Sequence, residues 1–174
     1  LLVIEDSAQP AESPGLAVVL DGGGAPGWIG REDTAASFRV EDPPDDPGAP
    51  LSLRTSLSEG PHRAGEIVRL SVAVHDRSGD GQASPIARIG IPAGLSVPAW
   101  QIDDLVDQGR VAAIEVGAGD VVLYWDGIDP SATLEVALDL TAEFPGTTTG
   151  APSSAWPYYA SGSRSWSAPL AIGR

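Results

Sequence analysis

The sequence predicts an all-β fold: an antiparallel β-sandwich with one short α-helix at about residues 97–108, preceded by a smaller β-rich segment. Glycine (21) and proline (16) make up about a fifth of the 174 residues and fall between short apolar runs, which is typical of a chain with many turns. Apolar and polar residues alternate with a period of two in several of these runs, as in strands with one buried face. One stretch, 96–109, has apolar residues at helical spacing instead.

The first fifty residues contain two candidate strands and end in a candidate linker. The run "GLAVVLDGGG" (15–24) predicts a strand that enters a glycine turn, and "TAASFRVED" (34–42) predicts a second strand. The prolines of "DPPDDPGAP" (42–50) cannot join a central ladder, and its carboxylates repel one another and stay hydrated. We therefore predict a boundary between residues 1–50 and a larger domain, 51–174. A long surface loop inside one domain is the alternative.

Five runs of the larger domain predict strands. In "GEIVRLSVAVHD" (65–76) four aliphatic side chains lie on one face, and mainly polar ones lie on the other. The run "TLEVALDLTAEF" (133–144) alternates in the same way, with Phe144 as the last residue of its apolar face. The connection "DGIDPSAT" (126–133) suits a β-hairpin loop before this strand. The other three strands are expected at 86–95, 110–116 and 120–128.

The segment "SVPAWQIDDLVDQG" predicts the helix. Ser96 can cap its start, Pro98 suits the first turn, and Gly109 can end it. Its expected apolar face consists of Trp100, Ile102, Leu105 and Val106. Its acidic residues, expected off that face, are Asp103, Asp104 and Asp107.

The charge and composition exclude several classes of function. The net charge is −14 with ten arginines and no lysine, which disfavours nucleic-acid binding and binding to anionic membranes. The absence of lysine removes Schiff-base and P-loop chemistry, and the absence of cysteine removes thiol catalysis and cysteine metal sites. No apolar run approaches the roughly 20 residues of a membrane helix. Because the chain starts at Leu1 and contains no methionine, we expect it to be a fragment of a longer protein.

The loop "DRSGDG" (76–81) has a calcium-site pattern. Asp76, Ser78 and Asp80 occupy alternate positions, and Gly81 stands at the sharp turn. An EF-hand loop also needs a bidentate glutamate at its twelfth position, which here is Ala87. A Gly/Asp hairpin turn between two strands is the favoured interpretation, and calcium binding stays the alternative.

The remaining polar patterns do not form a recognisable site. His62 and His75 are the only histidines, and no G-x-S-x-G elbow accompanies them. Asp103 and Asp104 are adjacent on a helix and therefore do not face each other. The run "DGGGAPG" (21–27) lacks the context of a phosphate loop. We assign no catalytic, cofactor-binding or metal-ligating residue, and we predict that the protein is not an enzyme and has no cofactor.

Five pieces of the larger domain occur in an order that resembles a known family. They are "GEIVRLSVAV", "IPAGL", "IDDLVDQGRVAAIEV", "DVVLYWDGI" and "AEFPGTTTGAPSSAWPYYASGSRSW". Together they are similar to the C-terminal receptor-binding domain of the bacterial α2-macroglobulin family, over roughly residues 51–172. The first fifty residues resemble the β-rich CUB-like segment that precedes this domain in the family.

This resemblance implies a β-sandwich with a helix on its side, from a large extracytoplasmic protein that traps proteases. The partners it implies are other domains of the same longer chain and, indirectly, the trapped protease. The family's thioester cysteine lies in another domain, and this chain has no cysteine. Animal relatives contact a clearance receptor through lysines on the helix, whereas the helix here is acidic. The resemblance therefore implies a non-catalytic module that packs against its neighbours and moves when the trap closes.

The closing segment 152–170 supports a rival hypothesis, a stand-alone ligand-binding β-sandwich such as a carbohydrate-binding or adhesion module. Its tryptophans could stack on a ligand, although we expect at least one of Tyr158 and Tyr159 to lie in the core. The candidate interaction residues of both hypotheses are Trp100, Asp103, Asp104, Asp107, Trp156 and Trp166.

Overall fold

The computed structural model describes residues 2–3, 19–20, 46–60 and 63–173. The chain divides into two units, Leu1–Phe38 and Arg39–Arg174. In the first unit, β1 (Leu2–Val3) pairs antiparallel with β2 (Val19–Leu20), which falls inside the strand predicted at 15–24. The strand predicted at 34–42 and the glycine run 21–27 lie outside the described residues. The boundary at residue 50 stays a prediction.

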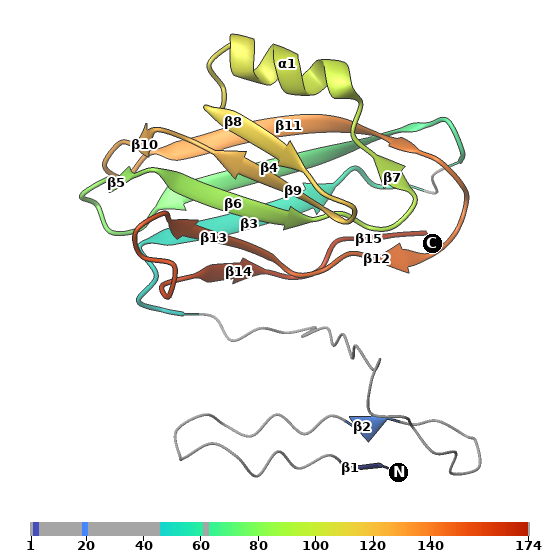
Figure 1. Cartoon of the computed structure of the whole chain (residues 1–174), viewed down its shortest axis with the longest axis horizontal. Coiled ribbons are helices and arrows are strands. Elements are labelled where there is room, and N and C mark those ends of the chain that lie inside the picture. Colours follow the sequence, from blue (N-terminus) through green and yellow to red (C-terminus); the bar gives the residue numbers. More distant parts are fainter. Residues whose placement is uncertain (1, 4–18, 21–45, 61–62, 174) are drawn as a thin grey trace, which may run out of the picture. The chain divides into compact units, whose positions relative to one another are not determined.

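Two antiparallel sheets face each other in the second unit and confirm the predicted all-β sandwich (Figure 1). The four-stranded sheet has the order β3 (Leu51–Leu57), β4 (Ile67–Asp76), β11 (Thr133–Ala142) and β7 (Leu95–Ser96). The five-stranded sheet has the order β14 (Ser165–Ser167), β13 (Ser153–Pro157), β6 (Pro85–Gly90), β9 (Asp120–Tyr124) and β8 (Ala113–Val116). Two short pairs join β5 (Gln82–Ala83) to β10 (Gly127–Ile128), and β12 (Thr148–Thr149) to β15 (Ala171–Ile172).

The core lies between the two sheets and follows the period-two pattern of the sequence. In β4 the inward residues Val68, Leu70 and Val74 are fully buried, while the outward residues alternate with them. Strand β11 pairs with β4 along its length and buries Leu138 and Leu140 in the same core. Each such side chain stabilises the fold by about 1.5–3 kcal/mol relative to exposure. Strand β3 also contributes to this core, although the sequence patterns above did not single it out.

Two predicted hairpins are crossovers between the sheets. The connection 126–133 joins β9 of the five-stranded sheet to β11 of the four-stranded sheet, so the hairpin prediction there was wrong. The turn 76–81 likewise joins β4 to the strands of the other sheet, by way of β5. Glycine, aspartate and proline permit a tight change of direction in both cases, whether the chain returns beside its own strand or crosses to another sheet. The pair β5–β10 holds the two crossovers together.

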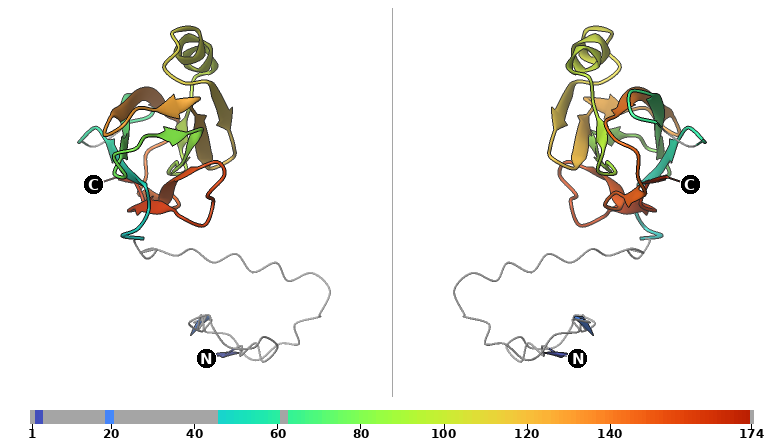
Figure 2. Two further views of the ribbon diagram at one scale, coloured as in Figure 1. Left: turned by 90° about the vertical axis from the view of Figure 1, so that its left-hand side faces the viewer. Right: turned by 90° about the vertical axis from the view of Figure 1, so that its right-hand side faces the viewer.

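Helix α1 (Ala99–Asp107) lies on the side of the sandwich near β8 and β11, outside both sheets (Figures 1 and 2). Its range agrees with the predicted helix, and Gly109 follows it with a φ of 65°. The predicted cap was wrong: Pro98 is the N-cap residue, and no side chain caps the helix. Ser96 instead belongs to β7 and donates its hydroxyl hydrogen bond to Glu143. Within the described residues, no helix combines the length and apolar character needed to cross a membrane.

Candidate functional site

The outer surface of α1 carries four of the predicted interaction residues. Trp100 is 62% exposed, and its acidic neighbours Asp103, Asp104 and Asp107 are exposed as well. The expected apolar face is therefore only partly buried. Ile102 and Leu105 are half-buried and Leu105 packs against the core, whereas Trp100 and Val106 are exposed. The helix thus presents a large exposed indole beside three carboxylates.

A polar residue, Gln101, fixes α1 to the sandwich. It is the one buried residue of the helix. Its Nε2 donates to the backbone oxygen of Asp139 at 2.5 Å, and its Oε1 accepts from the backbone nitrogen of Asp139 at 2.7 Å. Arg110 likewise donates to the backbone oxygen of Glu135 at 2.7 Å. These side chains pair with the edge of β11 that faces away from β4, so they take the place of a further strand there.

The outer face of the five-stranded sheet carries a row of aromatic and aliphatic residues. Trp156 of β13 lies opposite Ile86 of β6, which lies opposite Tyr124 of β9. Ile86 is 5% exposed, although it is on the outer face of the sheet, and a ring-bearing residue lies opposite it on each side. The guanidinium carbon of Arg164 lies 3.9 Å from the ring centroid of Trp156, within cation–π distance.

A groove of about 400 Å³ lies beside this row, and we call it the Trp156 groove. Its lining consists of Arg88, Glu115, Val116, Gly117, Asp120, Val122, Tyr124 and Trp156. The guanidinium of Arg88 forms an ion pair with Asp120. Burial raises the pKa of the Tyr124 hydroxyl, and the nearby negative charge of the Glu115 carboxylate raises this pKa further. The groove therefore combines two rings with one guanidinium and two carboxylates.

The two tyrosines that follow Trp156 are outside the core, contrary to prediction. Tyr158 is 58% exposed and Tyr159 is 85% exposed, and their rings pack edge to face with centroids 5.1 Å apart. The strand alternation ends at Pro157, because the chain then turns: the backbone nitrogen of Ala160 donates to the oxygen of Pro157. Both rings are consequently exposed, whereas Trp156 and Trp166, on which the rival ligand-binding hypothesis rests, are half-buried.

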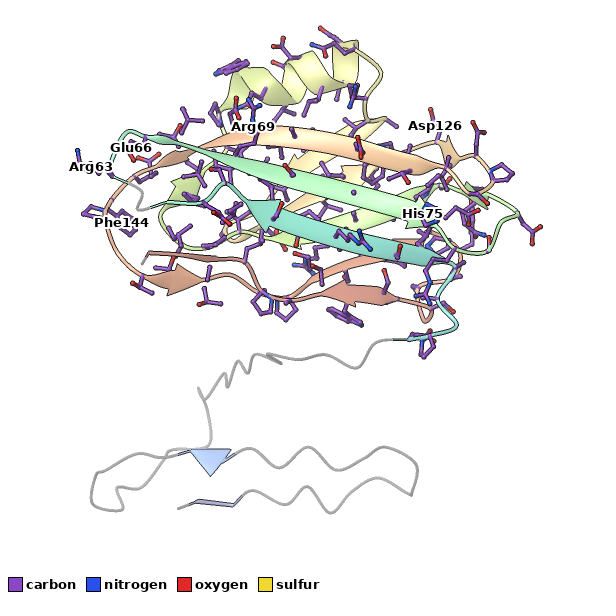
Figure 3. All side chains as sticks on the ribbon, turned by 180° about the vertical axis from the view of Figure 1, so that it is seen from behind. Arg63, Glu66, Arg69, His75, Asp126 and Phe144 are labelled. Atoms are coloured by element: carbon purple, nitrogen blue, oxygen red, sulfur yellow. The ribbon has the colours of Figure 1, made fainter. Side chains whose placement is uncertain are left out.

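Trp166 lies away from the Trp156 groove. It is on β14, the edge strand of the five-stranded sheet, which contacts β3 of the four-stranded sheet. Trp166 is half-buried and lines a second groove of about 710 Å³, the Trp166 groove, over the outer face of the four-stranded sheet. The floor of this groove carries small outward side chains: Ser56, Ser71, Ala73 and Ala137. Figure 3 shows this sheet with Arg69 and His75 labelled near opposite ends of β4. The predicted interaction residues thus occupy three separate surfaces: α1, the Trp156 groove and the Trp166 groove.

The Asp76 carboxylate, which the sequence placed in a calcium-site pattern, instead accepts hydrogen bonds that hold the 76–81 turn. This carboxylate is 1% exposed and accepts five hydrogen bonds of 2.6–3.2 Å: from the Ser78 nitrogen and hydroxyl and from the backbone nitrogens of Gly79, Gly81 and Ser131. Burial alone would raise its pKa, but these donors together lower it to about 2. A calcium ion would need the same oxygen lone pairs, so the geometry favours a turn over a calcium site. Among the described residues, no group of three or more metal-ligand side chains gathers.

The histidines do not form a site in the described part of the chain. The Nδ1 atom of His75 lies 3.0 Å from the backbone oxygen of Ala132 and 3.1 Å from the hydroxyl of Thr133. These partners belong to the crossover and the adjacent strand, so His75 has a local structural role. His62 lies outside the described residues.

Comparison of the whole structure with solved structures identifies the fold. No protein-family profile and no curated protein matches the sequence. Salmonella alpha-2-macroglobulin reacted with methylamine matches over 79% of this chain, with a TM-score of 0.60 and 16% identity. The sandwich has a fold found in bacterial alpha-2-macroglobulins. Escherichia coli alpha-2-macroglobulin from domain MG7 to the C-terminus matches over 78% of this chain, with a TM-score of 0.60 and 14% identity.

The resemblance to alpha-2-macroglobulin expected from the sequence is thus confirmed at the level of the fold. Trypsin-activated Escherichia coli alpha-2-macroglobulin also matches, with a TM-score of 0.56 and 14% identity over 80% of this chain. The chain spans 10% of the length of the Salmonella protein, 11% of the trypsin-activated protein and 25% of the MG7-to-C-terminus structure. It therefore corresponds to one part of each of these alpha-2-macroglobulin chains.

Proposed function

We propose that the chain is a non-catalytic C-terminal module of a macroglobulin-like protein that traps and inhibits proteases. In this proposal residues 51–174 form a domain like the receptor-binding domain, and residues 1–50 belong to a CUB-like segment or an N-terminal extension. The observation that carries the proposal is the fold match with a TM-score of 0.60 over 79% of the chain, to a part of much longer alpha-2-macroglobulins. The full-length protein would be extracytoplasmic.

The partners in this proposal are other domains of the same longer chain and, indirectly, a trapped protease. Helix α1 supports the domain contacts. Gln101 fixes the helix to β11, while Trp100 stays 62% exposed. Large rings are enriched at the centres of protein interfaces, where they lose contact with water. We therefore assign the α1 surface, Trp100 with Asp103, Asp104 and Asp107, as a contact with a neighbouring domain that changes when the trap closes.

Footprinting of the full-length protein tests this assignment. Hydroxyl-radical modification of tryptophans is measured by mass spectrometry in the 174-residue chain and in the complete gene product, before and after cleavage by trypsin. Trp100 should be modified in the chain alone and protected in the complete protein, with protection that changes on cleavage. Trp125 is the internal control, because it is 6% exposed and its Nε1 donates to the backbone oxygen of Arg110.

Two results would contradict the proposal. Equal modification of Trp100 in the chain and in the complete protein would remove the domain contact. A reading frame that begins near Leu1, without further β-sandwich domains or a signal peptide, would remove the protease-trap function itself.

A further inference from the structure

We propose that the Trp156 groove binds a neutral saccharide through ring contacts and planar hydrogen-bonding groups on the outer face of the five-stranded sheet. This inference is independent of the protease-trap proposal, since it rests on the side chains of β6, β8, β9 and β13. It gives the exposed aromatic residues of the closing segment a ligand of defined chemistry.

The apolar part of the groove comes from Tyr124 and Trp156. The two rings lie on one cross-strand row, and Ile86 between them is 5% exposed. The C–H face of a sugar ring is apolar, and burial against aromatic side chains removes that face from water. Arg164 holds the indole in place: its guanidinium carbon is 3.9 Å from the ring centroid, and its Nε donates to the backbone oxygen of Ser161 at 2.8 Å. A ring that is already held loses little further freedom on binding.

The polar part of the groove comes from Arg88, Asp120 and Glu115. Guanidinium and carboxylate groups are planar and can each form two parallel hydrogen bonds, which matches pairs of neighbouring sugar hydroxyls. Arg88 and Asp120 neutralise each other in an ion pair. Glu115 lies exposed on β8 and lines the groove together with Tyr124. These groups therefore supply both donors and acceptors around an apolar floor at Val122.

The charges in the groove favour a neutral ligand. The two carboxylates, in a chain with a net charge of −14, repel an anion. A cationic side chain would need an unpaired carboxylate, but the Asp120 carboxylate already pairs with Arg88. Glu115 alone does not form a cation site. A neutral polyhydroxyl ligand uses the paired groups without breaking their charge balance.

The size and position of the groove suit this ligand. A volume of about 400 Å³ falls in the usual range for small-molecule sites, roughly 300–1,000 Å³. Most of its lining residues stand on paired strands of one sheet, which hold side chains more rigidly than loops do. Tyr158 lies on the turn after β13 and is 58% exposed, so its ring is open to a second sugar unit beyond the groove.

The test is an NMR titration of the 174-residue chain that follows the indole N–H signals of its five tryptophans. The probes are cellohexaose, maltohexaose, mannohexaose and chitohexaose, each to about 10 mM, which detects dissociation constants of about 1 mM and below. Tetramethylammonium and Nα-acetyl-lysine methylamide serve as cationic probes. At least one hexasaccharide should shift the Trp156 signal, while the Trp100 and Trp166 signals stay in place.

Two variants connect the binding to the groove. Glu115→Gln and Arg88→Gln should each weaken saccharide binding by about tenfold or more, because each removes a charged hydrogen-bonding group from the groove. Glu135→Gln is the matched control, since Glu135 is an exposed strand carboxylate that lines the Trp166 groove. It should bind like the wild type, and thermal unfolding of all three variants verifies that they fold.

Three outcomes overturn the proposal. The first is an unchanged Trp156 signal with all four hexasaccharides. The second is a Trp156 shift with the cationic probes alone, which would assign the groove to a basic side chain. The third is saccharide binding that neither Glu115→Gln nor Arg88→Gln weakens, which would place the site elsewhere on the protein.

Discussion

Asp76 should make the folding of the sandwich dependent on pH in a defined acidic range. Its carboxylate is buried and accepts five hydrogen bonds that join the crossover after β4 to the crossover before β11. These donors lower its pKa from 3.8 to about 2. At 1.36 kcal/mol for each pKa unit, this difference corresponds to about 2 kcal/mol of stability.

The sign follows from the direction of the pKa change. The folded state favours the ionised carboxylate, so the contribution is fully present above the unfolded pKa of 3.8. It is lost as the pH falls from 3.8 through about 2, where the folded state also takes up the proton. The free energy of unfolding should therefore decrease with acidity in this window by about 2 kcal/mol on account of Asp76.

Urea unfolding of the wild type and of Asp76→Asn between pH 7 and pH 2 measures this contribution. An amide offers one acceptor oxygen and places an NH2 group against backbone donors, so the variant should lose about 2–4 kcal/mol at pH 7. The difference between the two proteins should shrink by about 2 kcal/mol from pH 5 to pH 2. Other carboxylates titrate in both proteins and cancel in the difference.

Asp80→Asn is the matched control, because Asp80 is an exposed carboxylate in the same turn. Its curve should run parallel to that of the wild type. A difference between wild type and Asp76→Asn that is as large at pH 2 as at pH 7 would refute the reasoning, as would an Asp76→Asn variant with wild-type stability at pH 7.

Three further substitutions, one of them with a matched control, test the packing. Gln101→Ala should lower the free energy of unfolding by about 2–3 kcal/mol and speed amide exchange in α1, since two hydrogen bonds to the edge of β11 are lost. Unchanged amide exchange in α1 would contradict the role of Gln101 as the anchor of the helix. Gly90→Ala should cost about 3 kcal/mol or more in thermal unfolding, because the new Cβ would collide with the backbone oxygen of Ala151, whereas Gly119→Ala, with open space, should be near neutral. Arg69→Ala should change stability by less than about 1 kcal/mol in urea unfolding, because its ion pair is exposed.

Much of the fold could be predicted from the period of the apolar residues. The alternation in β4 and β11 identified their buried faces, and the helical spacing before Gly109 located α1. Phe144 shows where this reasoning fails. It continues the alternation of β11, but the strand ends at Ala142 and Phe144 is 52% exposed beside Gly94. A period defines a face only while the chain stays extended, and it does not mark where the strand ends.

The connections between strands were harder to predict, for a physical reason. Tight turns in hairpins and in sheet crossovers use the same residues, because both need positive φ angles or local side-chain hydrogen bonds. The hydrogen bonds that Asp76 accepts distinguish the crossover from a hairpin, but they are visible only in the folded structure. One of their donors, the Ser131 nitrogen, is 55 residues away in sequence. The same limit applies to the Trp156 groove. Its residues come from four strands, and the register that aligns Trp156, Ile86 and Tyr124 depends on pairings far apart in the chain.

The separation of the candidate residues makes the two functional proposals independent. Trp100 belongs to α1, which side chains fix to the edge of the four-stranded sheet, whereas Trp156 belongs to the outer face of the five-stranded sheet. Exposed tyrosine and tryptophan rings can bind either a neighbouring domain or a ligand, because in both cases binding removes the ring from water. The partner is therefore decided by what surrounds each ring. Trp100 shares its helix with three exposed carboxylates, which suits a polar-rimmed domain interface. Paired charged groups and a groove lie beside Trp156, which suits a small neutral ligand.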